Sequence, residues 1–249
     1  MRLLVNGSGG KMGSVLRACI AERRGAMLVG GVDPRGRGQG QYLWYRSLDE
    51  VPARDTPDVL IDVSHYTALP GVLAYARRVR CALVAATTGG GAEERELLCR
   101  ASSEIPVFSA ANLSLGAALL RAFTKRLAEV FPEGDIEIVE AHHRGKRDAP
   151  GGTALSLFAA VKEARPRAKP HAGRRGEGVR EAGEVGIHAL RLGALPGTHT
   201  VFLATPEEGL TLTHTAYTPR VFALGALRAA EFLMGAPPGL YGMSDLLYE

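Results

Sequence analysis

Residues 1–13 constrain the fold more than any other stretch, because they join a short apolar run to a glycine-rich turn. Residues 2–6 (RLLVN) are typical of a buried strand, residues 7–13 (GSGGKMG) form the turn, and residues 15–22 continue with helical periodicity. Dinucleotide-binding folds use this order of strand, glycine turn and helix to lay a pyrophosphate on a helix N-terminus. The glycines recur every third residue, which departs from the strict GxGxxG pattern, so the order of the elements is the stronger signal.

Strands and helices continue to alternate along the first 110 residues. We expect strands at residues 26–32, 58–63, 81–86 and 106–110, and helices at residues 68–78 and 92–102. Alternation at this spacing predicts a parallel sheet that is covered by helices on both faces. Ligands of such sheets bind at the C-terminal ends of the strands.

Asp33 ends the second expected strand, at the place where this fold puts an acid that binds the adenosine ribose. An acid there favours NADH, because it repels the 2′-phosphate of NADPH. Arg35 and Arg37 follow closely and either could pair with that phosphate, so both cofactors stay open. A turn built from Asp33 and Pro34 is the structural alternative, and it is compatible with either cofactor.

The pattern changes after residue 113. We expect helices at residues 114–130 and 153–164, and strands at residues 135–139, 185–192, 200–205 and 210–217. Runs of strands after alternating units predict a second domain with a mixed or antiparallel open sheet. A last helix at residues 221–233 and the tail after it are expected to return to the first domain. The sequence therefore predicts an α/β protein: an N-terminal Rossmann-type doubly wound parallel sheet (residues 1–111 and 220–249) and a second α+β domain on a mixed open sheet (residues 112–219).

Charged residues are most concentrated in residues 140–155 (EAHHRGKRDAPGGTAL), between an expected strand and an expected helix. The first N–H groups of a helix have no intrahelical partner, so such a junction can bind an anion. An ordinary helix opening, with Asp148 as the cap and Pro150 in the first turn, is the alternative. The pair Gly151 and Gly152 favours the anion site, since two glycines cost helix stability unless something approaches the backbone closely.

Residues 140–154 resemble the signature of the 4-hydroxy-tetrahydrodipicolinate reductase (dihydrodipicolinate reductase) family, in which a His-His pair precedes Lys and then Asp-Ala-Pro-Ser-Gly-Thr-Ala. Gly151 stands where the family usually has serine; the lost hydroxyl should weaken substrate binding by about 1 kcal/mol at most. The N-terminal glycine turn and the loops at residues 86–89 and 110–113 also resemble the family's. Ala86 replaces its usual glycine and Leu113 its usual phenylalanine. Near Arg220 the chain is one residue shorter than the family pattern, which leaves the role of Arg220 open.

The resemblance implies hydride transfer from NADH or NADPH to a cyclic dicarboxylate, giving tetrahydrodipicolinate for diaminopimelate and lysine biosynthesis. It assigns His142 and Lys146 as catalytic residues, with Lys146 as the proton donor, and His143, Gly152 and Thr153 as substrate-binding residues. It also implies a homotetramer assembled through the second domain. The residues that it assigns to the cofactor are Gly7, Ser8, Gly9, Gly10, Lys11, Met12, Asp33, Ala86, Thr87, Thr88, Ala110, Ala111, Asn112 and Leu113.

Other functions explain the sequence less well. A semialdehyde dehydrogenase needs a nucleophilic cysteine in its second domain, whereas Cys19, Cys81 and Cys99 all precede residue 100. A non-catalytic NAD(P)-binding sensor is the serious alternative, but it leaves Lys146 and His142 without a task.

We expect no metal site. Adjacent residues on a strand point to opposite faces, so the His142–His143 pair cannot easily share a metal ion, and no cysteine is near. The scattered, odd number of cysteines indicates neither disulfides nor zinc, and we expect buried thiols. The remaining histidines receive no role: His65, His171, His188, His199 and His214.

Composition and charge indicate which partners the protein can have. The net charge of +4 and the pI near 9.1 come largely from arginine, most densely in residues 165–180. That stretch lacks interleaved aromatic residues, so we expect no nucleic-acid partner, and we interpret it as a mobile loop that draws in an anionic ligand. The sequence has no apolar run of membrane-spanning length and no signal-peptide pattern at its start, so we expect a cytoplasmic protein without a membrane partner.

Overall fold

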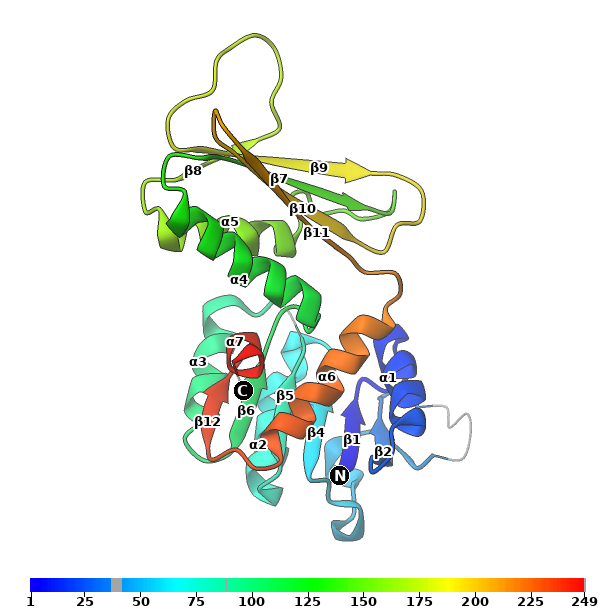
Figure 1. The fold of residues 1–249 in the computed structure, drawn as a ribbon. Helices are drawn as coiled ribbons and strands as arrows, with labels where there is room; N and C mark the ends of the chain where they lie inside the picture. The colour runs from blue at the N-terminus through cyan, green and yellow to red at the C-terminus, as the bar shows by residue number, and fades with distance from the viewer. Residues whose placement is uncertain (37–41, 88, 249) are drawn as a thin grey trace. The chain divides into compact units, whose positions relative to one another are not determined.

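The chain folds into two compact units in the computed structural model, which describes residues 1–36, 42–87 and 89–248. Unit 1 comprises residues 1–114 and 219–249, and unit 2 comprises residues 115–218. The sequence pattern put these boundaries at 111/112 and 219/220. Figure 1 shows that each unit is built on its own sheet.

Unit 1 contains a seven-stranded sheet in the order β12-β6-β5-β4-β1-β2-β3, and every neighbouring pair is parallel. The strand order reverses between β1 and β4, so the predicted doubly wound parallel sheet is confirmed. Its strands are β1 (Arg2–Asn6), β2 (Met27–Val32), β3 (Trp44–Tyr45), β4 (Val59–Asp62), β5 (Ala82–Ala85), β6 (Pro106–Ser109) and β12 (Gly239–Tyr241).

Helices cover both faces of this sheet. They are α1 (Lys11–Glu22), α2 (Leu69–Val79), α3 (Gly91–Ala101), α6 (Arg220–Leu233) and α7 (Met243–Leu247), with short 3-10 helices at Leu48–Glu50, Ala53–Asp55 and Tyr66–Ala68. Leu3 and Val5 face a core shared with α1 and α6, whereas Leu4 faces a second core shared with α2 and α3. Both faces of each central strand are buried, which is why these strands are continuous apolar runs instead of alternating ones.

Unit 2 contains a five-stranded sheet in the order β11-β10-β7-β9-β8. Strand β7 runs parallel to β9 and antiparallel to β10, so the sheet is mixed, as predicted. Its strands are β7 (Asp135–His142), β8 (Lys169–Ala172), β9 (Glu184–Arg191), β10 (Thr198–Ala204) and β11 (Gly209–Thr215), and its helices are α4 (Leu115–Val130) and α5 (Gly152–Ala164).

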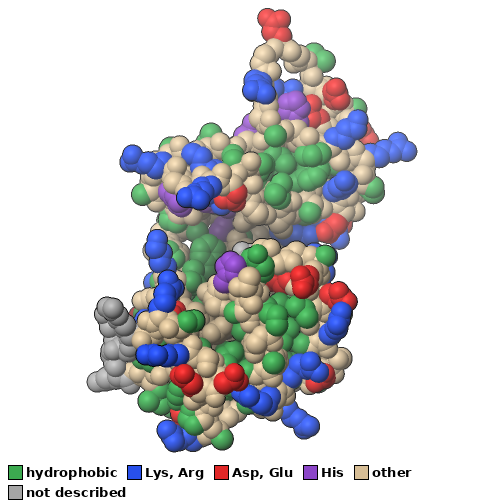
Figure 2. Space-filling view, turned by 180° about the vertical axis from the view of Figure 1, so that it is seen from behind, with side chains coloured by type: hydrophobic (Ala, Val, Ile, Leu, Met, Phe, Trp, Pro, Cys, Tyr) green, Lys and Arg blue, Asp and Glu red, His purple; other side chains and the backbone are tan. Residues whose placement is uncertain are grey.

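The two helices of unit 2 lie on one face of its sheet (Figure 1). Ile136 and Ile138 point to this face and form a core with Leu157 and Val161 of α5. The opposite face carries large apolar side chains that remain exposed, among them Phe202 at 42% exposure. Figure 2 shows hydrophobic side chains gathered on the surface of this unit. This face of the sheet therefore exposes apolar area to solvent.

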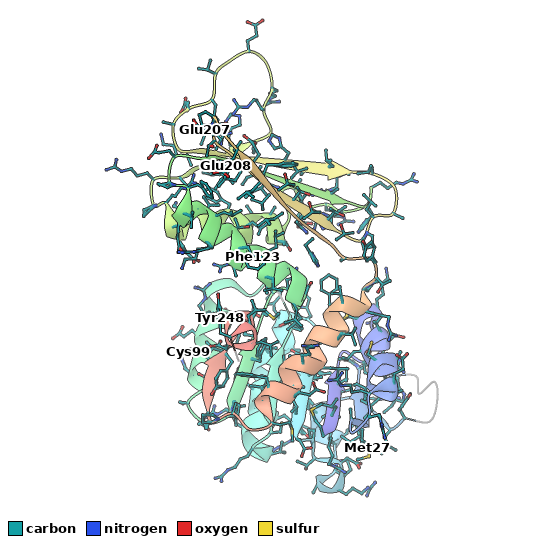
Figure 3. All side chains as sticks on the ribbon, in the orientation of Figure 1. Met27, Cys99, Phe123, Glu207, Glu208 and Tyr248 are labelled. Carbon is teal, nitrogen blue, oxygen red and sulfur yellow. The ribbon has the colours of Figure 1, made fainter. Side chains whose placement is uncertain are left out.

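Several expectations need correction. Strand β7 extends through His142, three residues beyond the expected end, and β8 was not expected. Cys19 and Cys81 are buried, but Cys99 is exposed on α3 (Figure 3) because its position faces away from the sheet. No helix among the described residues has the length and apolar character needed to cross a membrane.

The basic stretch at residues 165–180 was expected to be a mobile loop that draws in an anionic ligand, but two of its arginines form contacts within unit 2. Arg165 donates to the carbonyl oxygens of Ala128 and Gly134 at 3.0 and 2.7 Å. Arg180 pairs with Asp135 and Glu137 on β7. Arg165 thus fixes the connection between α4 and β7, and Arg180 is paired with acidic residues of β7. Both arginines therefore make contacts within unit 2.

Candidate active site

The glycine loop between β1 and α1 is packed too closely for side chains. Gly7 has a φ of +79°, and a Cβ on it would lie 2.8 Å from backbone atoms of Ser64. A Cβ on Gly13 would lie 2.3 Å from the carbonyl oxygen of Gly7. Gly9 and Gly10 complete the turn, and Lys11 and Met12 are the first residues of α1, which begins without a side-chain cap at Gly10. The backbone N–H groups at this helix start are therefore available to an anion.

A buried polar network supports this loop, and the sequence analysis missed it. The side-chain amide of Asn6 donates to Asp62 at 2.8 Å and to Ser64 at 3.1 Å, and the Ser64 hydroxyl donates to Asp62 at 2.6 Å. Burial raises the pKa of Asp62, although the bonds from Ser64 and Asn6 oppose the rise. Asn6 ends β1 and Asp62 ends β4, the two strands between which the order reverses. In this class of fold the cofactor binds at that reversal.

Asp33 lies beside the glycine loop, as its sequence position predicts. Its carboxylate accepts the N–H groups of Gly9 at 3.1 Å and Arg35 at 2.9 Å, and it is only 3% exposed. The Arg35 guanidinium lies 3.6 Å away with its side chain 86% exposed. Arg37 lies outside the described residues.

The remaining cofactor candidates of unit 1 occupy strand ends, but they differ in exposure. Ser8 and Thr87 are buried, Ala86 and Ala110 are half-buried, and Ala111 is exposed. Thr88 lies outside the described residues. The side-chain oxygen of Asn112 accepts the N–H of Ser114 at 2.8 Å, and the side chain of Leu113 is buried in the core beside α6. Leu113 therefore offers mainly its backbone to a ligand.

Four polar side chains gather on the apolar face of the second sheet. On β7 the inward-facing positions run Ile136, Ile138, Glu140 and His142, so two polar residues continue a row of core residues. The register pairs Glu140 with His199 on β10, and His142 with Arg191 on β9. Strand pairing thus brings together residues that are up to 59 positions apart in the sequence.

Glu140 is fully buried and is held by its Oε1 atom. Arg191 Nη2 and the Gly151 N–H each donate to this oxygen at 2.8 Å. Burial raises the pKa of Glu140, but the bonds from Arg191 and Gly151 outweigh burial, and the pKa is lowered overall. The carboxylate is therefore ionised at neutral pH, with its Oε2 atom 2.9 Å from His142 Nδ1 and 3.9 Å from His199 Nε2.

His199 is buried and His142 is half-buried, and their rings meet edge to face at 5.1 Å. Burial lowers the pKa of both, and that of His199 falls to about 4, with the nearby charge of His142 as the second cause. Glu140, Arg191 and His199 were given no role by the sequence analysis. The sequence did contain a signal for these residues. Every second residue of β7, β9 and β10 faces the core, and in each strand this apolar series has a polar residue at one end.

The burial of His199 leads to a prediction about stability. A histidine with a pKa near 6.5 when unfolded and about 4 when folded stabilises the fold fully above pH 6.5, and this contribution is lost as the pH falls towards 4. Because the pKa falls from 6.5 to about 4, the loss is about 3 kcal/mol. The free energy of unfolding should therefore fall by about 3 kcal/mol less in His199→Phe than in the parent when the pH is lowered from 7 to 4. Urea unfolding in the presence of EDTA measures it. Parallel pH profiles of the two proteins would contradict the prediction.

The loop after β7 carries the other candidate residues. His143 lies beyond the strand and is exposed, whereas Lys146 is half-buried and its Nζ lies 2.8 Å from Asp148. The bond from Lys146 lowers the pKa of Asp148. Asp148 thus pairs with Lys146 and does not cap α5, whose N-cap is Gly151. The alternative of an ordinary helix opening capped by Asp148 is wrong.

The two glycines of the loop have different surroundings. A Cβ on Gly151 would lie 2.8 Å from Glu140 Oε2 and 2.9 Å from Lys146 Cε, so glycine lets both side chains approach. Gly151→Ser would therefore displace Glu140 or Lys146, and a simple gain in substrate affinity is no longer expected. A Cβ on Gly152 would meet no described atom within 4 Å. Gly152 and Thr153 form the open start of α5, where an anion can reach the backbone N–H groups.

Arg220 lies at the start of α6 and forms an ion pair with Glu22 of α1, at 2.5 Å between exposed side chains. This ion pair connects two helices of unit 1. Such exposed pairs contribute about 0–1 kcal/mol, so this contact is a minor one.

Two family models match almost the whole chain: "Dihydrodipicolinate reductase, N-terminus" over residues 1–113 and "Dihydrodipicolinate reductase, C-terminus" over residues 116–247. The 4-hydroxy-tetrahydrodipicolinate reductase of Caldanaerobacter subterraneus subsp. tengcongensis is 40% identical over 99% of this chain and 98% of its own length. The chain belongs to the dihydrodipicolinate reductase family. The reductase of the same name from an Exiguobacterium species is 39% identical over 100% of this chain and 96% of its own length.

Solved structures agree with this fold. A dipicolinate-bound dihydrodipicolinate reductase from Paenisporosarcina sp. TG-14 superposes with a TM-score of 0.83 at 24% identity, covering 98% of both chains. A diaminopimelate dehydrogenase from C. glutamicum superposes with a TM-score of 0.64 at 13% identity, covering 99% of this chain and 95% of its own. At these identities the likeness shows the fold alone.

Proposed function

We propose that this dihydrodipicolinate reductase family member reduces 4-hydroxy-tetrahydrodipicolinate to tetrahydrodipicolinate, with NADH or NADPH as the reductant. The ring gains one hydride and one proton and loses its hydroxyl group as water. The reaction belongs to the biosynthesis of diaminopimelate and lysine. The observation that carries the proposal is the junction of β7 and α5, where Lys146, His142 and an open helix start lie within a few residues, in a chain matched by the family models over residues 1–113 and 116–247.

The fit of unit 1 to a dinucleotide rests on its glycine loop. At Gly7 and Gly13 a Cβ would meet backbone atoms of Ser64 and Gly7 at 2.8 and 2.3 Å, so glycine allows the tight turn and close helix packing that a dinucleotide-binding loop needs. The cofactor residues assigned from the sequence surround this loop and the ends of β5 and β6, and Asp33 would meet the ribose. When bound, reduced nicotinamide supplies the hydride.

The charged residues of unit 2 supply the proton and the electrostatic environment. Lys146 is the proposed proton donor: its ammonium group is half-buried and is held by Asp148. His142 is the second proposed catalytic residue, and the Glu140 carboxylate lies 2.9 Å from its Nδ1. Arg191 keeps Glu140 charged and in place. This arrangement resembles other catalytic histidines whose second nitrogen faces a buried carboxylate.

The substrate is a dicarboxylate and needs groups that bind anions. The N–H groups of Gly152 and Thr153 at the start of α5 are proposed to hold one carboxylate, together with the Thr153 hydroxyl. His143 is exposed beside this site and is proposed to contact the substrate.

A non-catalytic NAD(P) sensor is the alternative. It would use the glycine loop but would have no need of Lys146 or the open start of α5. The test is to mix the full chain with NADH or NADPH and the cyclic substrate and to follow the near-ultraviolet absorbance of the reduced nicotinamide. A substrate-dependent fall in absorbance supports a reductase, whereas cofactor binding without oxidation would support a sensor.

Thr153→Val should mainly raise the KM for the cyclic substrate. The Thr153 hydroxyl holds a carboxylate both before and during the reaction, so its loss weakens ground state and transition state alike. One hydrogen bond to a charged group corresponds to about 1.5–3 kcal/mol, so we expect KM to rise by roughly ten- to a hundredfold with kcat nearly unchanged. Steady-state kinetics decide this, with Thr205→Val on the far side of unit 2 as the matched control. A fall in kcat at unchanged KM would contradict the role.

Both nicotinamide cofactors should support the reaction with a modest preference. Asp33 disfavours a 2′-phosphate, but its carboxylate is already bonded to backbone N–H groups, and the exposed Arg35 beside it can pair with the phosphate. We expect the kcat/KM values for NADH and NADPH to differ by less than a thousandfold, or about 4 kcal/mol.

Arg35→Ala tests the cause of that balance. It should lower kcat/KM for NADPH by about tenfold or more and hardly affect NADH, because only NADPH carries the phosphate. Arg24→Ala, an exposed change beyond the other end of α1, is the control. Equal losses with both cofactors would show that Arg35 does not recognise the 2′-phosphate.

The open sheet face of unit 2 supports a further part of the proposal, assembly into a homotetramer. Leu190 and Phe202 point away from the helices on this face and are 49% and 42% exposed. Burying such residues between copies of the chain would stabilise an oligomer. Light scattering at four times the monomer mass is the expected result, and a monomer mass would contradict it.

A further inference from the structure

We propose that Glu140, His142 and His199 form a binding site for a divalent transition metal ion, specifically Zn²⁺. Each residue offers one ligand atom, and these atoms lie within 4.8 Å of one another in the interior of unit 2. The sequence-based argument against a metal concerned the adjacent pair His142 and His143. Strand pairing supplies a different pair, because His199 on β10 lies directly opposite Glu140.

The unsatisfied atoms of this cluster point to a missing ligand. Glu140 Oε2, His142 Nδ1 and both ring nitrogens of His199 are buried and have no hydrogen-bond partner among the described residues. The distance of 2.9 Å between Oε2 and Nδ1 is short, but the two atoms lack hydrogen-bond alignment. A buried polar atom without a partner costs about 1–3 kcal/mol. One such atom from each of the three residues lies close to this point, and an ion or a water molecule between them would give all three a partner.

The chemistry of the three ligands favours Zn²⁺ over a water molecule alone. Two imidazoles and one carboxylate form a ligand set that zinc proteins use, with a fourth position left for water. Zinc lies about 2.0–2.2 Å from each such ligand, so two ligands of a tetrahedral site lie about 3.3–3.6 Å apart. The separations of 2.9 and 3.9 Å lie on either side of this spacing. The widest pair, within 4.8 Å, needs to close by up to about 1.5 Å when the ion binds.

The carboxylate is also held as metal ligands usually are. Arg191 and the Gly151 N–H bind Oε1, which fixes the side chain and leaves Oε2 facing the two histidines. The positive charges of Arg191 and Lys146 oppose a second cation nearby. We therefore expect reversible binding that a chelator removes.

Zinc at this site would inhibit the reductase, a consequence that rests on the proposed function. The metal would occupy Nδ1 of His142 and leave its other ring nitrogen carrying hydrogen, so that the ring could no longer accept a proton. It would also withdraw Glu140 Oε2 from His142. The site thus couples metal binding to loss of the proton transfer assigned to His142.

The test uses tag-free, full-length protein that has been freed of metal with EDTA and then titrated with Co²⁺ in the absence of substrate. We expect one equivalent to bind and to give visible absorption bands of tetrahedral cobalt, which Zn²⁺ then abolishes by displacement. His199→Phe, which keeps an aromatic ring next to His142, should weaken binding at least a hundredfold. His199→Gln is the second variant in case the first folds poorly, and circular dichroism checks both.

His188→Gln is the matched control. His188 pairs with Glu137 at 2.6 Å on the neighbouring strands, so it offers the same two side-chain types with no third ligand near them among the described residues. We expect it to bind Co²⁺ as the parent does. Absence of a saturable site, or parent-like binding in the two His199 variants, would overturn the proposal and leave water as the occupant.

Activity is a separate arm of the experiment. Zn²⁺ should inhibit the parent and the His188→Gln variant, EDTA should reverse the inhibition, and the His199 variants should need at least a hundredfold more Zn²⁺. Equal sensitivity of all variants would overturn the inhibitory role. If no reductase activity is found at all, the proposed function fails, while the cobalt spectrum still decides the metal site.

Discussion

Lys146→Ala is expected to lower kcat by 10²- to 10⁴-fold, the range typical of a lost general acid. This corresponds to about 2.7–5.5 kcal/mol of transition-state stabilisation. The ammonium group of Lys146 is the proposed proton source, and Asp148 holds it at 2.8 Å beside the open start of α5. The glycine loop and Asp33, which belong to unit 1, are untouched by the substitution, so the affinity for NADH or NADPH should stay the same.

The measurement is steady-state kinetics together with cofactor titration by calorimetry. Lys162→Ala is the matched control, because Lys162 is an exposed lysine of α5 in the same unit. If Lys146→Ala keeps a near-normal kcat and shows only a higher KM, the lysine is a binding cation. The proton would then have to come from His142 or from water.

Glu140→Gln is expected to destabilise the protein by about 3–5 kcal/mol, because it removes one partner of a buried ion pair and leaves Arg191 with an uncompensated charge. Glu140 is 0% exposed and the Arg191 side chain is 18% exposed. Arg191 donates to Glu140 at 2.8 Å and also to the carbonyl oxygen of Asp148, so the pair links β7, β9 and the loop after β7.

Urea unfolding followed by far-ultraviolet circular dichroism measures this effect. Glu163→Gln is the control: Glu163 pairs with Arg121 and Lys125 at the surface, and such pairs contribute about 0–1 kcal/mol. The double variant Glu140→Gln/Arg191→Gln should recover part of the loss, since no unpaired charge remains. A change below 1 kcal/mol for Glu140→Gln alone would show that the pair is not a stabilising element.

The elements of unit 1 were predictable because each central strand is an apolar run followed by a glycine or polar turn. The structure confirms the strands at residues 2–6 and 106–109 within about one residue. Short edge strands such as β3 and β12 were not found, since two or three residues carry too little periodicity. Their places are determined by pairing with β2 and β6, which is a long-range interaction.

The candidate site was only partly visible in the sequence for the same reason. Lys146, His142 and the two glycines form one continuous stretch, so a local pattern contains them. His199 and Arg191 come from β10 and β9, and only the register of the mixed sheet brings them to Glu140. Exposure was equally hard to predict: Cys99 faces away from the sheet on α3, although Cys19 and Cys81 are buried.

Isotopic labelling can follow the hydrogen that passes from the nicotinamide to the substrate. NADH carrying deuterium on the reactive face of its nicotinamide ring is incubated with the full chain and 4-hydroxy-tetrahydrodipicolinate, and the product is analysed by mass spectrometry. We expect tetrahydrodipicolinate with one deuterium, formed together with an equal amount of NAD⁺ and much more slowly by Lys146→Ala. Cofactor that binds but is never oxidised, or a product without deuterium, would contradict it.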